Sequence, residues 1–313
     1  MSISDLTARG LVSGRTIVLT GATGFVGGHL LTGLLAAGYS VFALHRRPTA
    51  DGLRCEAGLT WLPLADAATL FKRQRIEAVC HLATAYGNGM ALTEVIESNV
   101  LMPLRLLEFA TEGACPLFVS TDTFFAKPEF NYPHMRSYIE SKRQFIRWAE
   151  LAAASAPATK VVNARLEHVY GPDDGPQKFV PYVLRELQAN APLALTPGDQ
   201  QRDFVHVDDV VGAYLRILAS AKAHPTGLRE IQIGTGESHT VRTFVETAQI
   251  SCGSTSMLNF GAYPHRLQEI MHSQADITVL RTLGWNPVHS LTSGIRAVLK
   301  GMSTRDQPLG TAQ

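Results

Sequence analysis

The sequence is poor in cysteine and has almost no net charge. Its four cysteines, Cys55, Cys80, Cys115 and Cys252, form no CxxC pair, which argues against a structural zinc site and against a disulfide framework. Lys and Arg number 28 against 27 for Asp and Glu, a net charge of +1. No broad basic field is therefore available to attract nucleic acid or an anionic membrane, and neither is expected as a partner. An anionic ligand would have to be held by local charges.

Long hydrophobic runs are missing as well. Gly, Tyr and Ser interrupt the apolar stretches well below the length of about 20 residues that a membrane span needs, and segment 1–15 lacks the apolar core of a signal peptide. A cytoplasmic location is the expectation. The remaining composition, 45% hydrophobic and 18% charged over 313 residues, is typical of a globular enzyme with one large domain or two closely joined ones.

Short apolar runs alternate with helical patterns in the first half of the chain. Runs that are apolar on both sides are typical of strands in a covered parallel sheet. Strand alternating with helix then predicts an α/β fold with a doubly wound parallel sheet. Strands are expected at 16–20, 40–45, 60–64, 78–83, 116–120 and 160–165, and helices at 28–37, about 92–111 and about 137–153.

The pattern becomes irregular after Gly171. Five prolines between residues 172 and 197 interrupt shorter elements, as in a smaller lobe with many turns. We therefore expect a dinucleotide-binding domain at 1–170, to which about 202–238 returns, and a smaller C-terminal substrate-binding lobe at 171–313.

A glycine-rich turn directly follows the first predicted strand and opens a Leu-rich helix. Gly21 permits the tight turn, Gly24 lets the backbone approach a pyrophosphate, and Gly27 lets the helix pack closely on the strand. The helix N-terminus offers N–H groups and a positive dipole end to the phosphates. A purely structural strand-to-helix turn is the alternative. The context favours a dinucleotide site of the Rossmann type, formed by Gly21, Thr23, Gly24, Phe25, Val26 and Gly27.

The end of the second predicted strand discriminates between the two nicotinamide dinucleotides. An acid at this place binds the adenosine ribose and repels a 2′-phosphate. Here the chain reads His45-Arg46-Arg47, and arginine forks suit phosphate oxygens. We therefore predict NADP(H) as the cofactor, with contacts from these three residues. A solvated basic loop is the alternative interpretation.

A hydroxyl residue and a Tyr-Lys pair follow in an order that suggests catalysis. Thr121 comes after the fifth predicted strand, and Tyr138 and Lys142 lie one turn apart on one helix face. The ammonium is expected to lower the pKa of Tyr138 from about 10. Such a tyrosine exchanges a proton with a carbinol oxygen while hydride passes to or from nicotinamide. A surface Tyr beside a solvated Lys is the alternative, but the order of the motifs favours a catalytic site.

This series of motifs resembles the extended short-chain dehydrogenase/reductase family, also known as the NAD-dependent epimerase/dehydratase family. That family contains nucleotide-sugar epimerases, 4,6-dehydratases and 4-ketoreductases. The matching segments run nearly end to end: TGATGFVG at 20–27, HLAT at 81–84, SNVLMPLRLLEFA at 98–110, STDTFF at 120–125, YIESK at 138–142, RLEHVYGP at 165–172, RDFVHVDDV at 202–210 and ADITVLRTLGWNP at 275–287.

The resemblance implies a role for each matching position. Thr121, Tyr138 and Lys142 become the catalytic trio, with Asn99 supporting the lysine. Leu82, Ala83 and Thr84 are expected to line the dinucleotide together with Asn99, Tyr138 and Lys142. Two arginines are expected to face a substrate diphosphate. The residues expected at the nucleotide sugar are Thr84, Tyr86, Thr121, Asp122, Thr123, His168, Lys178, Phe179, Arg202 and Arg266.

No metal site is predicted. The carboxylate pair Asp208 and Asp209 directly precedes an apolar helical run, where acids stabilise a helix N-terminus. The histidines, including His81 at the end of the fourth predicted strand, show no HxxxH or HxH spacing.

The active-site run narrows the reaction. Sugar 4,6-dehydratases of the family typically read Thr-Asp-Glu where this chain reads Thr121-Asp122-Thr123, so dehydration is not expected. The basic tip at 45–47 argues against an epimerase with tightly held NAD. The pattern is most similar to the CDP-abequose and CDP-paratose synthase group, which reduces CDP-4-keto-3,6-dideoxyglucose. We therefore predict NADPH-dependent reduction of the 4-keto group of a nucleotide-diphosphate deoxysugar.

Two alternatives remain: an NAD(P)-dependent 4-epimerase and a non-catalytic NADP-binding protein, against which the intact catalytic trio argues. The resemblance also implies a homodimer formed through the helices at about 92–111 and 137–153.

Overall fold

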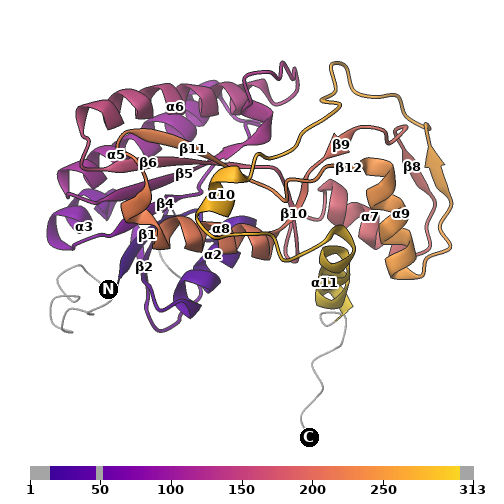
Figure 1. Ribbon diagram of the computed structural model, residues 1–313, viewed down its shortest axis with the longest axis horizontal. Helices are drawn as coiled ribbons and strands as arrows, with labels where there is room; N and C mark the ends of the chain where they lie inside the picture. Colours follow the sequence, from indigo (N-terminus) through magenta and orange to yellow (C-terminus); the bar gives the residue numbers. More distant parts are fainter. Residues whose placement is uncertain (1–14, 47–51, 304–313) are drawn as a thin grey trace, which may run out of the picture. The chain divides into compact units, whose positions relative to one another are not determined.

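The computed structural model describes residues 15–46 and 52–303. These residues form two compact units, and the chain passes between them several times (Figure 1). The first unit lies within Met1–Ala126, His134–Arg165 and Tyr214–Ile231, and the second within Lys127–Pro133, Leu166–Ala213 and Gln232–Gln313. The unit boundaries thus fall at other residues than 170, 202 and 238, the domain limits expected from the sequence.

A seven-stranded sheet forms the centre of the first unit. Its strand order is β11-β6-β5-β4-β1-β2-β3, and the pairings from β3 to β5 are parallel. The chain moves outward from β1 to β3 and then returns to β4 on the other side of β1, so the switch point lies between β1 and β4. The predicted doubly wound parallel sheet is confirmed. The strands are β1 Thr16–Thr20, β2 Ser40–His45, β3 Leu59–Pro63, β4 Ala78–His81, β5 Leu117–Thr123, β6 Lys160–Leu166 and β11 Leu228–Ile233.

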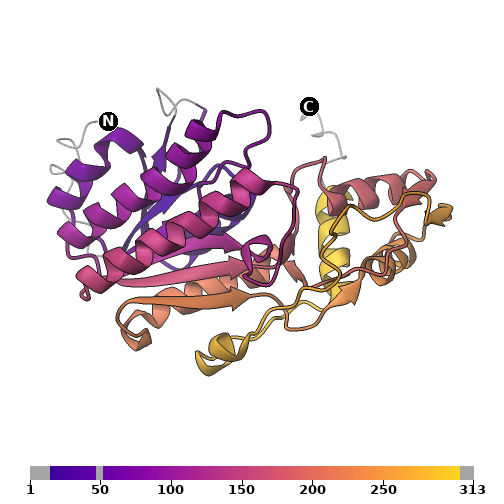
Figure 2. The ribbon, with the colours of Figure 1, turned by 90° about the horizontal axis from the view of Figure 1, so that it is seen from above.

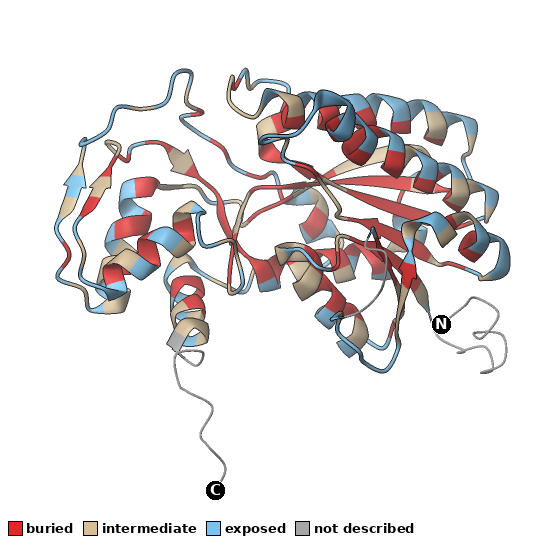
Figure 3. Cartoon of the chain, turned by 180° about the vertical axis from the view of Figure 1, so that it is seen from behind, coloured by how far each residue is buried: buried red, intermediate tan, exposed pale blue. Residues whose placement is uncertain are grey.

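Helices cover both faces of this sheet. Three of them, α3 (Ala67–Arg73), α5 (Met102–Glu112) and α6 (Arg136–Ser155), pack side by side on one face (Figure 2). Their apolar sides meet alternate strand residues such as Val18 and Phe118 in one buried cluster. On the other face α2 (Phe25–Ala36) buries its leucines. The strands are buried along most of their length, whereas each helix exposes its outer side (Figure 3).

The second unit is built from short strands and helices. Its two-stranded sheets pair β7 with β10 and β8 with β13 in parallel, and β9 with β12 antiparallel. Phe204 and Phe244 lie at the centre of its core, with ring centroids 4.4 Å apart. The elements are β7 His168–Tyr170, α7 Phe179–Gln188, β8 Leu193–Leu195, β9 Gln201–Arg202, β10 Phe204–His206, α8 Val207–Ala219, β12 His239–Thr240, α9 Val241–Cys252, β13 Leu258–Phe260, α10 Thr278–Thr282 and α11 Leu291–Ser303. The last residues of α8 belong to the first unit.

The helix expected at about 92–111 differs most from its prediction. The structure has α4 (Leu92–Ile96), a π-helical segment Glu97–Leu101 and then α5. Pro103 lacks the N–H that an α-helix would pair with the carbonyl of Asn99, so the regular hydrogen-bond ladder is interrupted here. None of the helices in the described part of the chain is both long enough and apolar enough to cross a bilayer.

Candidate active site

The glycine-rich turn joins β1 to α2 at the carboxyl edge of the sheet. Gly21 has φ +74°, and a Cβ on it would lie 2.6 Å from the backbone nitrogen of Ala83. A Cβ on Gly27 would overlap the carbonyl oxygen of Gly21. Thr23 and Gly24 are exposed at the tip, and Gly24 directly precedes α2. The turn therefore presents backbone and the helix N-terminus, with Thr23 as the exposed side chain at its tip, which fits a dinucleotide pyrophosphate.

Thr20 ties this turn to the segment that follows β4. Its Oγ1 lies 2.8 Å from Nδ1 of His81 and accepts hydrogen bonds from the backbone N–H groups of Leu82 and Ala83. Burial, together with the positive charge of Lys142, lowers the pKa of His81 to about 3. His81 is therefore neutral near pH 7 and acts as part of the frame, while Leu82 and Ala83 are held beside the glycine turn.

Two of the three residues predicted to select NADP, His45 and Arg46, lie at the end of β2 within the described part of the chain. His45 is buried with its ring near that of Trp61, whereas Arg46 is exposed and donates from Nη1 to Ser98 Oγ at 3.4 Å. Arg47 lies outside the described residues. An exposed guanidinium next to the strand end, with no acid there, is compatible with a 2′-phosphate.

The predicted catalytic trio comes together between β5 and α6. Lys142 Nζ donates to the carbonyl oxygen of Thr121 at 2.8 Å and lies 5.9 Å from the ring centroid of Tyr138. The hydroxyl of Thr121 lies 2.5 Å from that of Tyr214, a fully buried tyrosine of α8. The side chains of Thr121, Tyr138, Tyr214 and Lys142 thus bring three hydroxyl groups and one ammonium to this part of the first unit.

The pKa of Tyr138 moves in the direction opposite to the sequence-based prediction. Burial raises the pKa of its hydroxyl, Tyr86 and Asp122 raise it further, and a hydrogen bond with Thr123 opposes them. The ammonium of Lys142 is directed at the carbonyl of Thr121. Burial also lowers the pKa of Lys142 to about 8, against the opposing attraction of Asp122. Tyr138 therefore stays protonated near pH 7.

The side-chain amide of Asn99 makes four hydrogen bonds. Its Oδ1 accepts from Ala85 N at 2.7 Å and from Thr84 Oγ1 at 3.2 Å, while its Nδ2 donates to Ala85 O and to Ser141 Oγ. Because Ser141 precedes Lys142 in α6, the amide joins the segment after β4 to the helix that carries Lys142. The support expected for the lysine would therefore pass through Ser141, and it stays a prediction.

Asp122 is not free to bind a substrate hydroxyl. Its side chain is almost fully buried, its Oδ1 accepts from the backbone N–H of Thr123 at 2.8 Å, and its Oδ2 accepts from Asn163 and from Arg165 at 3.0 and 3.1 Å. Arg165 also pairs with Glu230. The structure makes Asp122 part of the support beneath β5 rather than of the substrate surface.

Tyr86 borders the trio on its exposed side. Its ring centroid lies 5.1 Å from that of Tyr138, and 45% of its surface is exposed. A partly exposed aromatic ring next to Tyr138 is suited to contact a substrate.

The other predicted substrate residues lie in the second unit. Arg202 pairs with Glu269 at 2.6 Å, and Arg266 donates to the hydroxyl of Tyr132 at 3.1 Å. The negative charge of Glu269 acts on both arginines and favours their charged forms, so the two guanidinium groups belong to one local cluster.

Three further candidates lie on β7 and at the start of α7. Burial, with smaller contributions from Arg202 and Lys178, lowers the pKa of His168 to about 3, which keeps this imidazole neutral. Lys178 pairs with Asp174 at 2.9 Å. Phe179 begins α7 and packs its ring against Phe244, 5.9 Å between centroids.

Several supporting residues were missed from the sequence. Tyr214 lies in the apolar helix α8, and Ser141 directly precedes the lysine of the YxxxK motif. Arg165 lies near the end of β6. No local pattern marks them, because their partners are 93, 42 and 43 residues away in the chain.

Comparison with known proteins agrees with this geometry. The family model described as the NAD dependent epimerase/dehydratase family matches residues 17–234. The chain belongs to this family. Among the relatives of this epimerase/dehydratase family member are CDP-abequose synthases of Salmonella muenchen and Salmonella typhimurium, 38% and 39% identical over 91% of this chain and 97% of theirs.

Solved structures show the same fold for this family member. A UDP-glucose 4-epimerase from Thermotoga maritima, solved with UDP-glucose, superposes with a TM-score of 0.78. It is 22% identical, and the match covers 94% of this chain and all of the other. The likeness establishes the Rossmann-type architecture, and the family match places the chain among enzymes.

Proposed function

We propose that the enzyme reduces the 4-keto group of a nucleotide-diphosphate deoxysugar, with NADPH as reductant and a CDP-linked 4-keto-3,6-dideoxyglucose as the sugar class. The observation that carries this proposal is the meeting of Thr121, Tyr138 and Lys142 between β5 and α6, in the unit that also carries the glycine turn. The CDP-abequose synthase relatives support the substrate class.

The cofactor is NADP(H) in this proposal, with the first unit as its binding domain. The glycine turn would hold the pyrophosphate, Leu82, Ala83 and Thr84 would line the dinucleotide, and Arg46 with Arg47 would meet the 2′-phosphate. The absence of an acid at the end of β2 supports NADP over NAD. The chemistry that the nicotinamide supplies when bound is transfer of a hydride to the sugar carbon.

Tyr138 serves as the proton donor to the developing alkoxide oxygen. Its raised pKa keeps the proton on the hydroxyl until the substrate oxygen acquires negative charge. Lys142 provides the positive charge beside it. When the hydroxyl of Tyr214 donates to Thr121, the proton of Thr121 is left to hydrogen-bond the substrate oxygen.

The second unit is the substrate-binding lobe in this proposal. Arg202 and Arg266 contact the diphosphate, since two guanidinium groups suit its oxygens. His168, Lys178 and Phe179 contact the nucleotide.

Within the first unit, Tyr86, Thr84 and Thr123 contact the sugar. Asp122 is assigned a positioning role because its carboxylate oxygens are engaged by buried donors. Thr123 occupies the place of the glutamate that a 4,6-dehydratase would need, which supports reduction over dehydration.

A homodimer through α4 to α6 is part of the proposal. These helices expose several large apolar side chains of the kind that protein interfaces cover. Analytical ultracentrifugation of the wild type and of a Trp148→Glu/Leu151→Glu variant tests it, since only the variant should sediment as a monomer. The exposed side chains are Leu92, Ile96, Leu101, Trp148 and Leu151.

Cofactor binding and turnover test the proposed reaction. NADPH and NADH are titrated by fluorescence against the wild type and an Arg46→Ala/Arg47→Ala variant. NADPH should bind more tightly to the wild type, and the variant should lose this preference. CDP-, dTDP- and UDP-linked 4-keto sugars are then assayed with NADPH. Purification with bound NAD, together with interconversion of UDP-sugars, would instead establish a 4-epimerase.

A further inference from the structure

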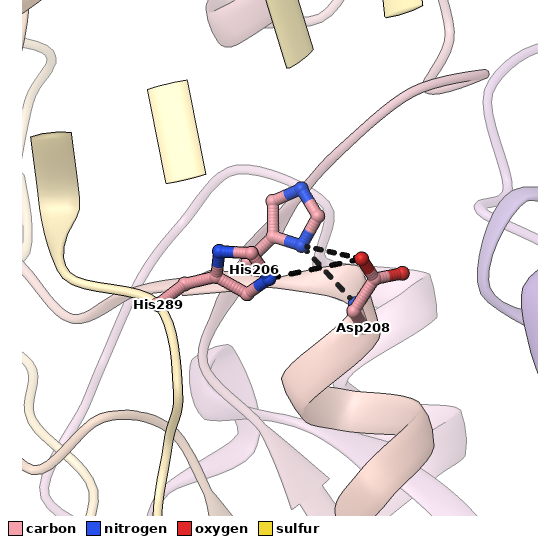
Figure 4. A group of neighbouring side chains, drawn as sticks. All are labelled: His206, Asp208 and His289. Carbon is pink, nitrogen blue, oxygen red and sulfur yellow. Dashed lines mark hydrogen bonds and ion pairs between the residues drawn. The ribbon is translucent and has the colours of Figure 1, made fainter. Parts of the chain in front are cut away.

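Three side chains outside the proposed active site converge at the start of α8. His206 ends β10, Asp208 lies in the first turn of α8, and His289 lies just before α11. Oδ2 of Asp208 lies 3.5 Å from Nδ1 of His206 and 3.7 Å from Nε2 of His289 (Figure 4). All three nearest ligand atoms lie within 4.8 Å of one another.

These separations suit a shared cation better than direct hydrogen bonds. N–H···O hydrogen bonds measure about 2.7–3.2 Å, and both contacts to Asp208 are longer. Two ligands bound tetrahedrally at about 2.0–2.1 Å from one ion lie about 3.4 Å apart. The observed 3.5 and 3.7 Å are close to that value.

The tautomer of His206 also agrees with metal binding. The backbone N–H of Asp208 donates to Nδ1 of His206 at 3.3 Å. Nδ1 therefore carries a lone pair, and that lone pair points toward Asp208. A neutral imidazole is the form that ligates a metal, and a bound ion would take this lone pair over from the long contact to the amide N–H of Asp208.

Neighbouring groups fix the position of His289. The two carboxylate oxygens of Asp209 accept hydrogen bonds from the backbone N–H groups of Val288 and His289, at 2.7 and 3.1 Å. The aspartate pair thus has two roles: Asp209 anchors the segment before α11, and Asp208 faces the imidazoles. The buried ring of His206 is held by edge contact with Tyr170. Such outer contacts are what orient metal ligands in proteins.

The donor set selects the class of cation. Two imidazole nitrogens and one carboxylate oxygen suit zinc and other divalent first-row transition metals, whereas magnesium and calcium prefer oxygen ligands. Asp208 is 62% exposed and His289 22% exposed, so water can complete the coordination. The prediction of no metal rested on spacing along the chain, which brings no histidine near His289.

We propose that His206, Asp208 and His289 bind one divalent transition-metal ion, with zinc as the reference ligand, independently of the proposed reductase site. The ion would join the start of α8 to the segment preceding α11 within the second unit. Its expected effect is to raise the thermal stability of the protein, since a ligand that binds only the native state stabilises it.

Metal titration of the tag-free, EDTA-treated protein tests this proposal. Zinc affinity and stoichiometry are measured by competition with a chromophoric chelator, and Co²⁺ reports tetrahedral ligation through its visible absorption bands. The wild type should bind one ion per chain and melt at a higher temperature in its presence. His289→Ala and Asp208→Asn should each weaken binding by at least the roughly 10- to 100-fold that loss of an outer-shell partner costs. His272→Ala, which removes an exposed histidine of the same unit, is the matched control and should bind like the wild type.

Three results would overturn the proposal. They are the absence of saturable binding to the wild type, unchanged affinity in both ligand variants, and an equal loss of affinity in His272→Ala. Circular dichroism of every variant shows whether it is folded. Because Asp208 is exposed, its replacement by Asn gives a folded variant even if the histidine replacement does not.

Discussion

Replacing Tyr214 by Phe isolates the hydrogen bond that holds Thr121. The substitution removes one buried hydroxyl, 2.5 Å from Thr121 Oγ1, and keeps the packed ring. A hydrogen bond contributes about 0.5–1.5 kcal/mol net, so the free energy of unfolding should fall by about 1 kcal/mol. If the same bond aims the hydroxyl of Thr121 at the substrate oxygen, kcat should fall about 2- to 13-fold with little change in KM, at about 1.36 kcal/mol for each factor of ten.

A double-mutant cycle separates positioning from general damage. NADPH oxidation by the 4-keto sugar is measured for the wild type, Tyr214→Phe, Thr121→Val and the double variant. If Tyr214 acts through Thr121, its replacement has no further effect on kcat once the threonine hydroxyl is gone. Tyr39→Phe is the control, since its hydroxyl accepts from Arg15 at the opposite, amino end of the strands.

The reasoning fails if Tyr214→Phe lowers kcat by the same factor in both backgrounds. It also fails if kcat is unchanged while the protein loses the expected stability, because the bond would then serve the fold alone. An equal loss of kcat in Tyr39→Phe would show that any buried tyrosine hydroxyl has this effect.

Three further predictions concern the frame, the pH dependence and the support below β5. Gly27→Ala should lower the free energy of unfolding by about 1–3 kcal/mol, because the new methyl group meets the carbonyl oxygen of Gly21 in the turn. Gly28→Ala should be neutral or stabilising, since its methyl group would lie 3.6 Å from the nearest atom, the carbonyl oxygen of Ala22. Equal stabilities of the two variants in urea unfolding would contradict this prediction. The kcat/KM profile should fall as pH rises through about 8, because Lys142 loses its charge there; a profile flat to pH 10 would exclude its ammonium from the mechanism. Asp122→Asn should lower the free energy of unfolding by about 3–5 kcal/mol, because it leaves the buried guanidinium of Arg165 partly unpaired. Glu230→Gln removes a more exposed partner of the same arginine and should cost under about 1 kcal/mol. Equal losses of stability in thermal unfolding would refute the difference in burial as the cause.

Local sequence patterns located the sheet well. Segments 16–20 and 40–45 form strands with the predicted bounds, because each is a short apolar run that ends at a polar or glycine-containing turn. The strand expected at 116–120 spans Leu117–Thr123, so it continues into polar residues that apolar periodicity does not mark as strand.

The candidate site was predictable where chemistry depends on nearby residues. The Tyr138–Lys142 spacing places both side chains on one face of α6, and the glycine turn has the expected conformation. The electrostatics were not predictable in this way. The raised pKa of Tyr138 comes from burial under tertiary contacts, and the positioning of Thr121 depends on Tyr214, far away in the sequence.

The four hydrogen bonds of Asn99 restrict this position to a single amino acid. The amide oxygen meets two donors and the amide nitrogen meets two acceptors, so its full capacity is used inside the protein. Aspartate has the same shape but would turn two attractive contacts with acceptors into repulsive ones, and leucine would leave four polar partners unsatisfied. Conversion of this amide to a carboxylate would therefore release the segment after β4 from α6.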